Sequence, residues 1–152
     1  MDEWRKHRVE DPDGIARIVR ESHRIAVLGI KPESRRGQAA FDVPEYMANA
    51  GYEIVPVPVY YPEVTTILGQ AVRRRVSEIE GTIDLVNVFR RSQDIPPHLD
   101  DILAAHPKAV WFQLGIRNDA AAERLARAGI DVVQDRCLLI EHGRMRRRPW
   151  PR

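Results

Sequence analysis

Five short runs of apolar residues, rich in valine and isoleucine, recur along this chain and limit what it can fold into. They lie at residues 25–28, 54–57, 85–89, 109–112 and 130–133. Polar and apolar residues hardly alternate within the runs, which is typical of strands that are buried on both faces of a sheet. Helical patterns separate the runs. This order predicts an α/β fold: a doubly wound, mainly parallel five-stranded sheet with helices on both faces.

The segments between the runs supply the expected helices. Residues 62–80, 95–103 and 120–128 have apolar residues at helical spacing, and residues 15–22, before the first run, are expected to form an extra helix. Asn118 is suited to cap the last of these helices, and Gly129 follows its end.

The crossover between Gly37 and Gly51 contains Pro44, which has no N–H and is unfavourable inside a helix. One arrangement is a short helix that Asp42 caps, with Pro44 in its first turn. The other is a longer helix that kinks at Pro44. We favour the short helix.

Length and composition limit the class of protein. A chain of 152 residues with 43% hydrophobic and 30% charged residues has the size and composition of one folded domain. No apolar run approaches the roughly 20 residues needed to span a membrane, and residues 1–14 contain no apolar signal segment. The single cysteine excludes an internal disulfide and any multi-cysteine metal site. We therefore expect a cytoplasmic protein that has no membrane partner.

The distribution of charge suggests how the chain is divided. A net charge of +2 gives no reason to expect a nucleic-acid ligand. Residues 144–152 carry five arginines, two prolines and a tryptophan, and we expect them to form a mostly solvated tail. The expected organisation is a single domain over residues 1–143, followed by this Arg-rich tail.

A ligand of a doubly wound sheet binds at the carboxyl ends of the strands, so the residues that follow the runs are the candidates for a site. The first run is followed by a loop from Gly29 to Gly37 that contains Lys31, Arg35 and Arg36. A glycine at the turn, the N–H groups of a following helix and three cations suit the phosphates of a ligand. The loop is neither a G-x-G-x-x-G motif nor a P-loop. The alternative is a solvated loop without a ligand.

The loops after the second and third runs add further candidates. Pro58 and Tyr60 follow the second run, where the acidic residue that would hold an NAD ribose is missing. Prolines and tyrosines at this point are instead compatible with the wall of an adenine pocket. Arg90 follows the third run, and a buried arginine there would need a carboxylate or a ligand phosphate as its partner.

The sequence gives no support for catalysis. Cys137 lies just beyond the fifth run, and nothing places one of the five histidines beside it as a base. A lone cysteine is more often a small buried residue than a nucleophile. We find no Ser-His-Asp signature, no metal-ligand spacing and no paired catalytic carboxylates. We therefore expect a binding protein rather than an enzyme.

Three sequence elements are specific in combination: VFR after the third run, W-x-QLG after the fourth, and DRC followed by IEH near the end. Over roughly residues 20–145 the chain resembles the small bacterial CoA-binding proteins, stand-alone forms of the CoA-binding domain of succinyl-CoA synthetase. The resemblance implies a Rossmann-like domain that holds coenzyme A or acyl-CoA across its strand ends. It does not imply synthetase activity, because the phospho-histidine segment and the nucleotide-grasp domain of the ligases are missing.

The resemblance also implies which residues contact the cofactor. The first loop would bind the CoA phosphates or ribose, the second loop the nucleotide, and the third and fourth loops the pantetheine arm, with the cysteine near the thiol. The implied cofactor-binding residues are Gly29, Ile30, Lys31, Ser34, Arg35, Arg36, Gly37, Val57, Pro58, Tyr60, Phe89, Arg90, Gln113, Gly115 and Cys137. Lys31 stands where the family usually has a serine, and the usual V-N-P asparagine of the second strand is absent.

Two other functions are compatible with the same residues. One is a sensor of a different nucleotide, such as NAD(H), on the same fold. The other is a subunit that docks on a protein partner, with a vestigial cofactor cleft. Small domains of this type often pair, so a homodimer is also compatible with the sequence.

Overall fold

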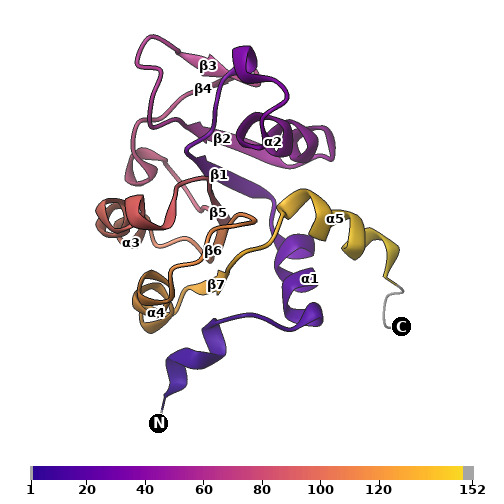
Figure 1. The fold of residues 1–152 in the computed structure, drawn as a ribbon, viewed down its shortest axis with the longest axis vertical. Coiled ribbons are helices and arrows are strands. Elements are labelled where there is room, and N and C mark those ends of the chain that lie inside the picture. The colour runs from indigo at the N-terminus through magenta and orange to yellow at the C-terminus, as the bar shows by residue number, and fades with distance from the viewer. Residues whose placement is uncertain (1, 149–152) are drawn as a thin grey trace.

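The central sheet has five parallel strands in the order β2-β1-β5-β6-β7 (Figure 1). The structure is a computed structural model and describes residues 2–148. The strands are β1 (Arg24–Leu28), β2 (Glu53–Val57), β5 (Leu85–Val88), β6 (Ala109–Phe112) and β7 (Asp131–Val133). Each apolar run of the sequence overlaps one of these strands, so the predicted α/β fold with a parallel sheet is confirmed.

Strand β1 lies between β2 and β5, and its Ile25 is paired with Ile54 on one side and Leu85 on the other. The chain first moves from β1 outward to β2 and then returns past β1 to β5. The order of the strands therefore reverses between β1 and β5. In doubly wound sheets, ligands bind in the crevice outside the carboxyl ends of the strands at such a reversal.

Helices cover both faces of the sheet, as predicted (Figure 1). One face carries α1 (Pro12–Glu21), α2 (Ala39–Asn49) and α5 (Leu138–Arg147), and the other carries α3 (Leu99–Ala105) and α4 (Asp119–Arg127). Successive strand residues point to opposite faces, so each strand contributes to both layers. In β1, for example, Val27 packs in the layer of α1, α2 and α5, whereas Leu28 packs in the layer of α3 and α4.

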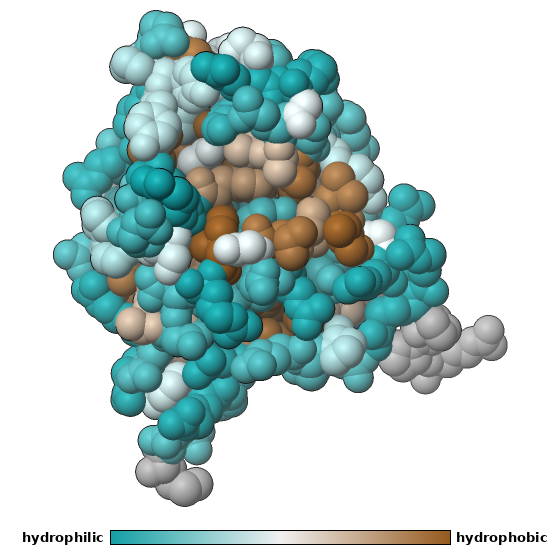
Figure 2. Space-filling view, viewed as in Figure 1, coloured by the Kyte–Doolittle hydropathy of each residue, from teal (hydrophilic) through white to brown (hydrophobic). Residues whose placement is uncertain are grey.

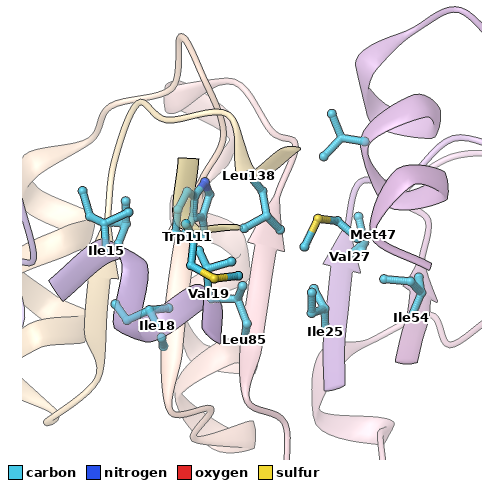
Figure 3. Close-up of a cluster of buried hydrophobic side chains, with 14 of the residues drawn as sticks. Ile15, Ile18, Val19, Ile25, Val27, Met47, Ile54, Leu85, Trp111 and Leu138 are labelled. Atoms are coloured by element: carbon cyan, nitrogen blue, oxygen red, sulfur yellow. The ribbon is translucent and has the colours of Figure 1, made fainter. Parts of the chain in front are cut away.

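The layer of α1, α2 and α5 is an interdigitated apolar core (Figure 3). Val19 of α1, Leu85 of β5 and Trp111 of β6 are completely buried in it. The indole N–H of Trp111 donates to the carbonyl oxygen of Arg136 at 2.8 Å, which ties this core to the segment that leads into α5. The packing therefore fixes the start of α5 at the carboxyl end of β6.

The segment of residues 62–80 is not a helix, and that prediction was wrong. It contains a two-stranded antiparallel hairpin of β3 (Thr66–Ile67) and β4 (Gln70–Ala71), followed by a 3-10 turn at Val76–Glu78. Leu68 and Gly69 form the hairpin turn with φ of 53° and 73°, values that fit a two-residue hairpin turn but not a helix. The apolar spacing of this segment comes from residues that reach the core from a hairpin and a turn.

Helix α2 is longer than the preferred prediction, and Pro44 lies in its interior. The short helix was therefore wrong. Proline removes the N–H that would bond to the carbonyl oxygen of Ala40. That oxygen instead accepts the backbone N–H of Lys31 at 3.1 Å, so the gap in the helix anchors the loop after β1.

The first and last parts of the described residues both pack on the domain. Residues 144–147, which we expected in a solvated tail, form the last turn of α5, and Met145 is buried there. Residues 149–152 of the predicted tail lie outside the described residues. At the other end, Trp4 is buried against α4, and the N–H of Val9 donates to Val132 of β7 at 2.9 Å. In the described part of the chain, no helix is long and apolar enough to cross a membrane.

Candidate functional site

The reversal point between β1 and β5 holds a cavity of about 260 Å³. It is lined by Gly29, Ile30, Lys31, Val59, Tyr60, Tyr61, Phe89, Arg90, Arg91 and Asp94. These residues come from the loops that follow β1, β2 and β5. In the space-filling view, the surface over the ends of these strands is hollowed, and apolar residues gather around the hollow (Figure 2). The cavity therefore lies where the fold predicts a ligand.

The loop after β1 meets the end of β5 without space between them. Gly29 has φ of +88°, and a Cβ at this position would lie less than 3 Å from the carbonyl oxygen of Phe89. The N–H of Phe89 in turn donates to the carbonyl oxygen of Leu28 at 2.8 Å. Only glycine fits this turn, because it tolerates the positive φ and has no side chain to collide with β5.

Lys31 and Arg35 of the loop after β1 and Arg90 of the loop after β5 have no carboxylate partner in the described part of the chain. The Nζ of Lys31 donates to the Oε1 of Gln38 at 2.6 Å, and the Nε of Arg35 donates to the Tyr61 hydroxyl at 3.1 Å. Neutral partners leave both positive charges uncompensated. Arg36 differs, because it pairs with Glu45 at 2.6 Å and lies over the Phe41 ring, outside the cavity.

Arg90 is the clearest unsatisfied group in the site. Its guanidinium lies over the ring of Tyr60, 5.4 Å from the ring centroid, and its Nε is buried without a hydrogen-bond partner among the described residues. Burial, and after it the charge of Arg90, lowers the pKa of His98. A buried N–H without an acceptor destabilises a fold unless a ligand or water supplies one. Arg90, which is partly buried, thus lacks the carboxylate partner that sequence reasoning considered.

One arginine, Arg74, stabilises the loop after β2 that forms a wall of the cavity. Arg74 donates to the carbonyl oxygens of Tyr60, Tyr61, Pro62 and Val64, at distances from 2.6 to 3.4 Å. Tyr61 itself has φ of 62°, an uncommon conformation for a residue with a large side chain. The four hydrogen bonds stabilise this loop in its bent form.

Two buried amide side chains, those of Asn87 and Gln113, lie between the ends of β5 and β6 and the start of α5. The Oε1 of Gln113 accepts hydrogen bonds from the backbone N–H of Leu138 at 3.3 Å and from the Nδ2 of Asn87 at 3.2 Å. Both amide side chains are almost fully buried, and the Oδ1 of Asn87 has no partner in the described part of the chain. Cys137 directly precedes Leu138 and is partly buried at the start of α5. Gly115 is exposed nearby, and its N–H donates to Asp135 at 2.7 Å.

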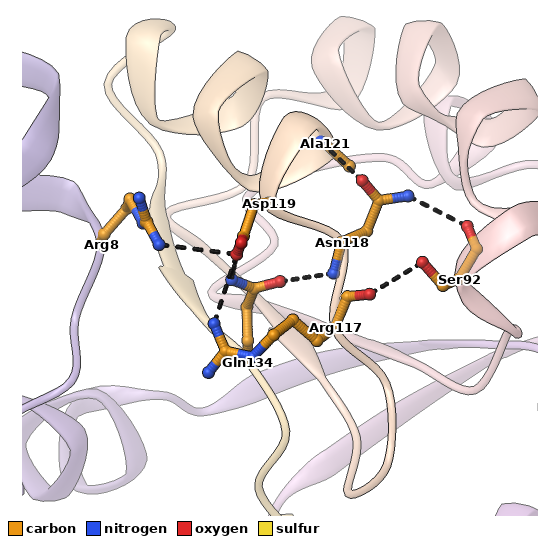
Figure 4. Close-up of polar contacts among 7 residues, drawn as sticks. All are labelled: Arg8, Ser92, Arg117, Asn118, Asp119, Ala121 and Gln134. Carbon is orange, nitrogen blue, oxygen red and sulfur yellow. Dashed lines mark hydrogen bonds and ion pairs between the residues drawn. The ribbon is translucent and has the colours of Figure 1, made fainter.

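The loop between β6 and α4 is held by a polar network (Figure 4). Asn118 accepts the N–H of Ala121 at 3.0 Å, which confirms it as the cap of α4, and its Nδ2 donates to the carbonyl oxygen of Ser92 at 3.0 Å. Gln134 accepts the N–H of Asn118 at 2.7 Å. A cavity of about 180 Å³ lies beside this network, but its Arg8 and Arg117 already pair with Asp119.

The structure brings together only part of the predicted set. Six predicted residues line the reversal-point cavity: Gly29, Ile30, Lys31, Tyr60, Phe89 and Arg90. Val57 and Pro58 are buried below it, whereas Ser34, Arg35, Arg36 and Gly37 are exposed beside it and Gln113, Gly115 and Cys137 lie toward α5. Sequence reasoning did not select Val59, Tyr61, Arg91 or Asp94, and it did not select Asn87 although a polar residue inside an apolar strand was a visible signal. Among residues 2–148, no group of His, Cys, Asp and Glu side chains is arranged to hold a metal ion.

Comparisons with known proteins agree with this geometry. Residues 23–143 match the CoA binding domain family. YneT of Bacillus subtilis (strain 168), named an uncharacterized protein, is 36% identical over 128 residues, which cover 84% of this chain and 91% of YneT. The solved structure of cell-free ID.343 from Thermus thermophilus is 31% identical with a TM-score of 0.81, and the match covers 90% of this chain and 99% of that one.

A larger enzyme shares the fold. The dinucleotide-forming acetyl-coenzyme A synthetase 1 of Ca. Korarchaeum cryptofilum aligns with a TM-score of 0.59 at 18% identity, over 72% of this chain and 25% of the synthetase. At this identity the likeness shows the fold alone. The family match, which spans most of the sequence, together with the 36% identity to YneT, establishes that the chain belongs to the CoA binding domain family.

Proposed function

We propose that this protein binds coenzyme A, free or acylated, across the carboxyl ends of β1, β2 and β5, and that it does so without catalysing a reaction. The observation that carries the proposal is the cavity at the strand-order reversal, with Lys31 and Arg90 in its lining and no carboxylate paired to either in the described residues. Membership of the CoA binding domain family supports the choice of ligand.

The cations suit the phosphates of the cofactor. Phosphate oxygens are strong acceptors, and charge-assisted hydrogen bonds to them are about twice as strong as neutral ones. The buried Nε of Arg90 would gain the acceptor that it lacks in the protein. Arg35, in the same loop as Lys31, lies over the Tyr61 ring and would add positive charge at the outer end of the cavity. Arg36 would contribute less, since Glu45 already neutralises it.

The wall after β2 favours a CoA nucleotide over NAD. Tyr60 and Tyr61 present aromatic rings to the cavity, and rings of this kind stack on an adenine. An NAD site would have an acidic residue at the end of β2 to hold the ribose hydroxyls. Pro58 and Val59 occupy that point instead.

Binding without turnover is supported by the surroundings of Cys137. The histidine nearest to it in sequence, His142, bonds through its Nδ1 to the Tyr46 hydroxyl at 2.9 Å, so that nitrogen is not free to act as a base for the thiol. A cysteine can be activated by such a base or by the N-terminus of a helix, and Cys137 precedes α5, so turnover itself is the test. Incubation with acetyl-CoA is expected to release no free CoA above the buffer rate.

Isothermal titration of CoA into the reduced protein, with NADH as the comparison ligand, tests the proposal. We expect CoA to bind and NADH not to bind. Lys31→Ala and Arg90→Ala should each weaken CoA binding roughly 5- to 150-fold, the effect of about 1–3 kcal/mol for a charged hydrogen bond. Arg124→Ala on α4 is the matched control and should change nothing. Binding of NADH alone, or unchanged affinity in both cavity variants, would contradict the proposal.

A further inference from the structure

Gln113 presents a hydrogen-bond donor that nothing in the described part of the chain uses. Its Oε1 accepts from the backbone N–H of Leu138, which can only donate, and from the Nδ2 of Asn87. These two contacts determine which end of the amide is the oxygen, so the Nε2 group must point the other way. The side chain is 4% exposed, and its Nε2 has no acceptor among the described residues.

The start of α5 lies directly beside this donor. Leu138 is the first residue of the helix, and Cys137 precedes it without a side-chain capping bond. The first N–H groups of a helix have no intrahelical acceptors. Gln113 already accepts the N–H of Leu138, and the N–H groups of Leu139 and Ile140 follow it in the first turn. The surroundings of Gln113 therefore offer donors to a carbonyl oxygen.

Exposed apolar side chains occur close in sequence to Gln113 and to the start of α5. Three large hydrophobic residues are exposed in the described part of the chain: Tyr60 at 61%, Leu114 at 60% and Ile140 at 44%. Tyr60 belongs to the proposed nucleotide wall. Leu114 follows Gln113 in the chain, and Ile140 lies two residues after Leu138, whose N–H bonds to Gln113, so both are within a few residues of the amide and of Cys137. In Figure 2 apolar residues border the hollow over these elements.

We propose that Gln113, Leu114 and Ile140 form an acyl subsite that selects CoA thioesters with an apolar acyl group over free CoA. Gln113 donates through its Nε2 to the thioester carbonyl oxygen, and the acyl chain lies over Leu114 and Ile140. This inference rests on the proposed binding of CoA, whose thiol end would lie near Cys137.

The charges near the subsite argue against an acidic acyl group. A terminal carboxylate would need a cation without a partner. Arg117 pairs with Asp119 at 3.2 Å, and Arg136 faces Glu141 at 3.9 Å. Glu141 is itself buried and pairs with Arg144 at 2.7 Å. The nearest arginines are thus already compensated, and a further carboxylate would lie beside Glu141 and Asp135.

Titration with a series of ligands tests the subsite on the intact, reduced protein. CoA, acetyl-CoA, butyryl-CoA and hexanoyl-CoA should bind with affinity that rises roughly two- to fourfold for each methylene, the range between half and full burial. Succinyl-CoA should bind less tightly than butyryl-CoA. The thioether S-butyl-CoA, which has the same chain but no carbonyl, should bind roughly 2- to 13-fold less tightly than butyryl-CoA because it cannot accept from Gln113.

Variants separate the two parts of the subsite. Leu114→Ser and Ile140→Ser, both at exposed positions, should remove the dependence on chain length and leave the affinity for free CoA unchanged. Leu103→Ser on α3 is the control and should keep the dependence. Gln113→Glu keeps the shape and the acceptor for Leu138 but loses the donor, and it should abolish the difference between butyryl-CoA and S-butyl-CoA.

The outcomes distinguish this inference from the proposed function. Binding of CoA with no dependence on chain length, or with succinyl-CoA preferred, overturns the acyl subsite and leaves CoA binding intact. Equal affinity for butyryl-CoA and its thioether overturns the role of Gln113. Failure of every CoA compound to bind overturns both proposals.

Discussion

Gly29 and Phe89 pack so closely that no side chain fits between the end of β1 and the end of β5. A Cβ on residue 29 would lie less than 3 Å from the carbonyl oxygen of Phe89, which belongs to backbone and cannot rotate away. Gly29 also has a positive φ of 88°. The floor of the reversal-point cavity is therefore formed by main chain, which allows a ligand to approach both strands.

Gly29→Ala should destabilise the protein by at least about 2 kcal/mol, because the strained φ costs about 1–2 kcal/mol and the collision with Phe89 adds to it. Urea unfolding measures the loss, and CoA titration should show that the remaining folded protein binds weakly. Gly51→Ala is a matched control: it has φ of +103°, but a Cβ there would meet no atom within 4 Å. If both variants lose the same stability, the collision with Phe89 is not the cause.

Arg74→Ala should release the loop of residues 60–64, since its four carbonyl oxygens would lose their common donor. We expect roughly tenfold weaker CoA binding and faster amide hydrogen exchange at Tyr61 and Val64. Global stability should change by less than about 1 kcal/mol, because the loop is on the surface. Arg74→Lys should not restore binding, since an ammonium group cannot reach several carbonyls as a planar guanidinium does.

Arg73→Ala serves as the control for Arg74. The side chain of Arg73 donates only to the carbonyl oxygen of Ala71, and its backbone contact with Pro56 survives the change. Equal loss of binding in the two variants would mean that the charge of this segment matters, and not the hydrogen bonds of Arg74.

The sequence was sufficient to predict the sheet but not the hairpin next to it. Strands buried on both faces leave a continuous apolar run, as in Ala109–Phe112, and a run of four or five residues is too short for a buried helix. The segment with Leu68, Val76 and Ile79 has a spacing close to four residues, which a helix and a hairpin with a following turn can both produce. Gly69, which adopts a positive φ in the hairpin, is the residue in this segment that indicates a turn.

The lining of the cavity was predictable where a residue lies within three positions of the end of a strand. Lys31 and Arg90 meet this condition, because the fold places the ends of β1 and β5 side by side. Arg74 does not: its partners are backbone carbonyls 10 to 14 residues away, and no local pattern in the sequence reveals a contact of that kind. Tyr61 was missed for the same reason, since its orientation depends on the loop that Arg74 holds.

Asn118→Ala should destabilise the protein by about 1–2 kcal/mol, because α4 loses its cap and the loop after β6 loses its bond to Ser92 (Figure 4). Asn118→Asp keeps the acceptor for the Ala121 N–H and favours the helix dipole, but it cannot donate to Ser92. We expect a smaller loss for Asp than for Ala in thermal unfolding. Equal losses for Asp and Ala would show that the bond to Ser92, which both variants remove, and not the cap, is the main contribution.

His142 should make the protein less stable as the pH falls below about 6.5. The side chain is almost fully buried, with its Nδ1 on the Tyr46 hydroxyl and its ring edge-on to the rings of Tyr46 and Tyr52. Burial, and after it the charge of Arg146, lowers the pKa of His142 below the ordinary value of 6.5. Between the lowered pKa and 6.5 the unfolded chain binds the proton and the folded protein does not, so acid favours unfolding. One such group changes the unfolding free energy by at most about 1.4 kcal/mol per pH unit.

Urea unfolding between pH 7 and pH 5 measures this dependence in the protein and in His142→Gln, which should show a shallower slope. His98, whose pKa burial also lowers, accounts for the slope that remains, and His98→Gln should reduce it further. His106→Asn, at an exposed left-handed position that asparagine tolerates, is the control and should keep the full slope. Asp84 and Asp101 have pKa values below 3.8 and contribute only at lower pH. An unchanged slope in His142→Gln would mean that the proton binds elsewhere when the protein unfolds in acid.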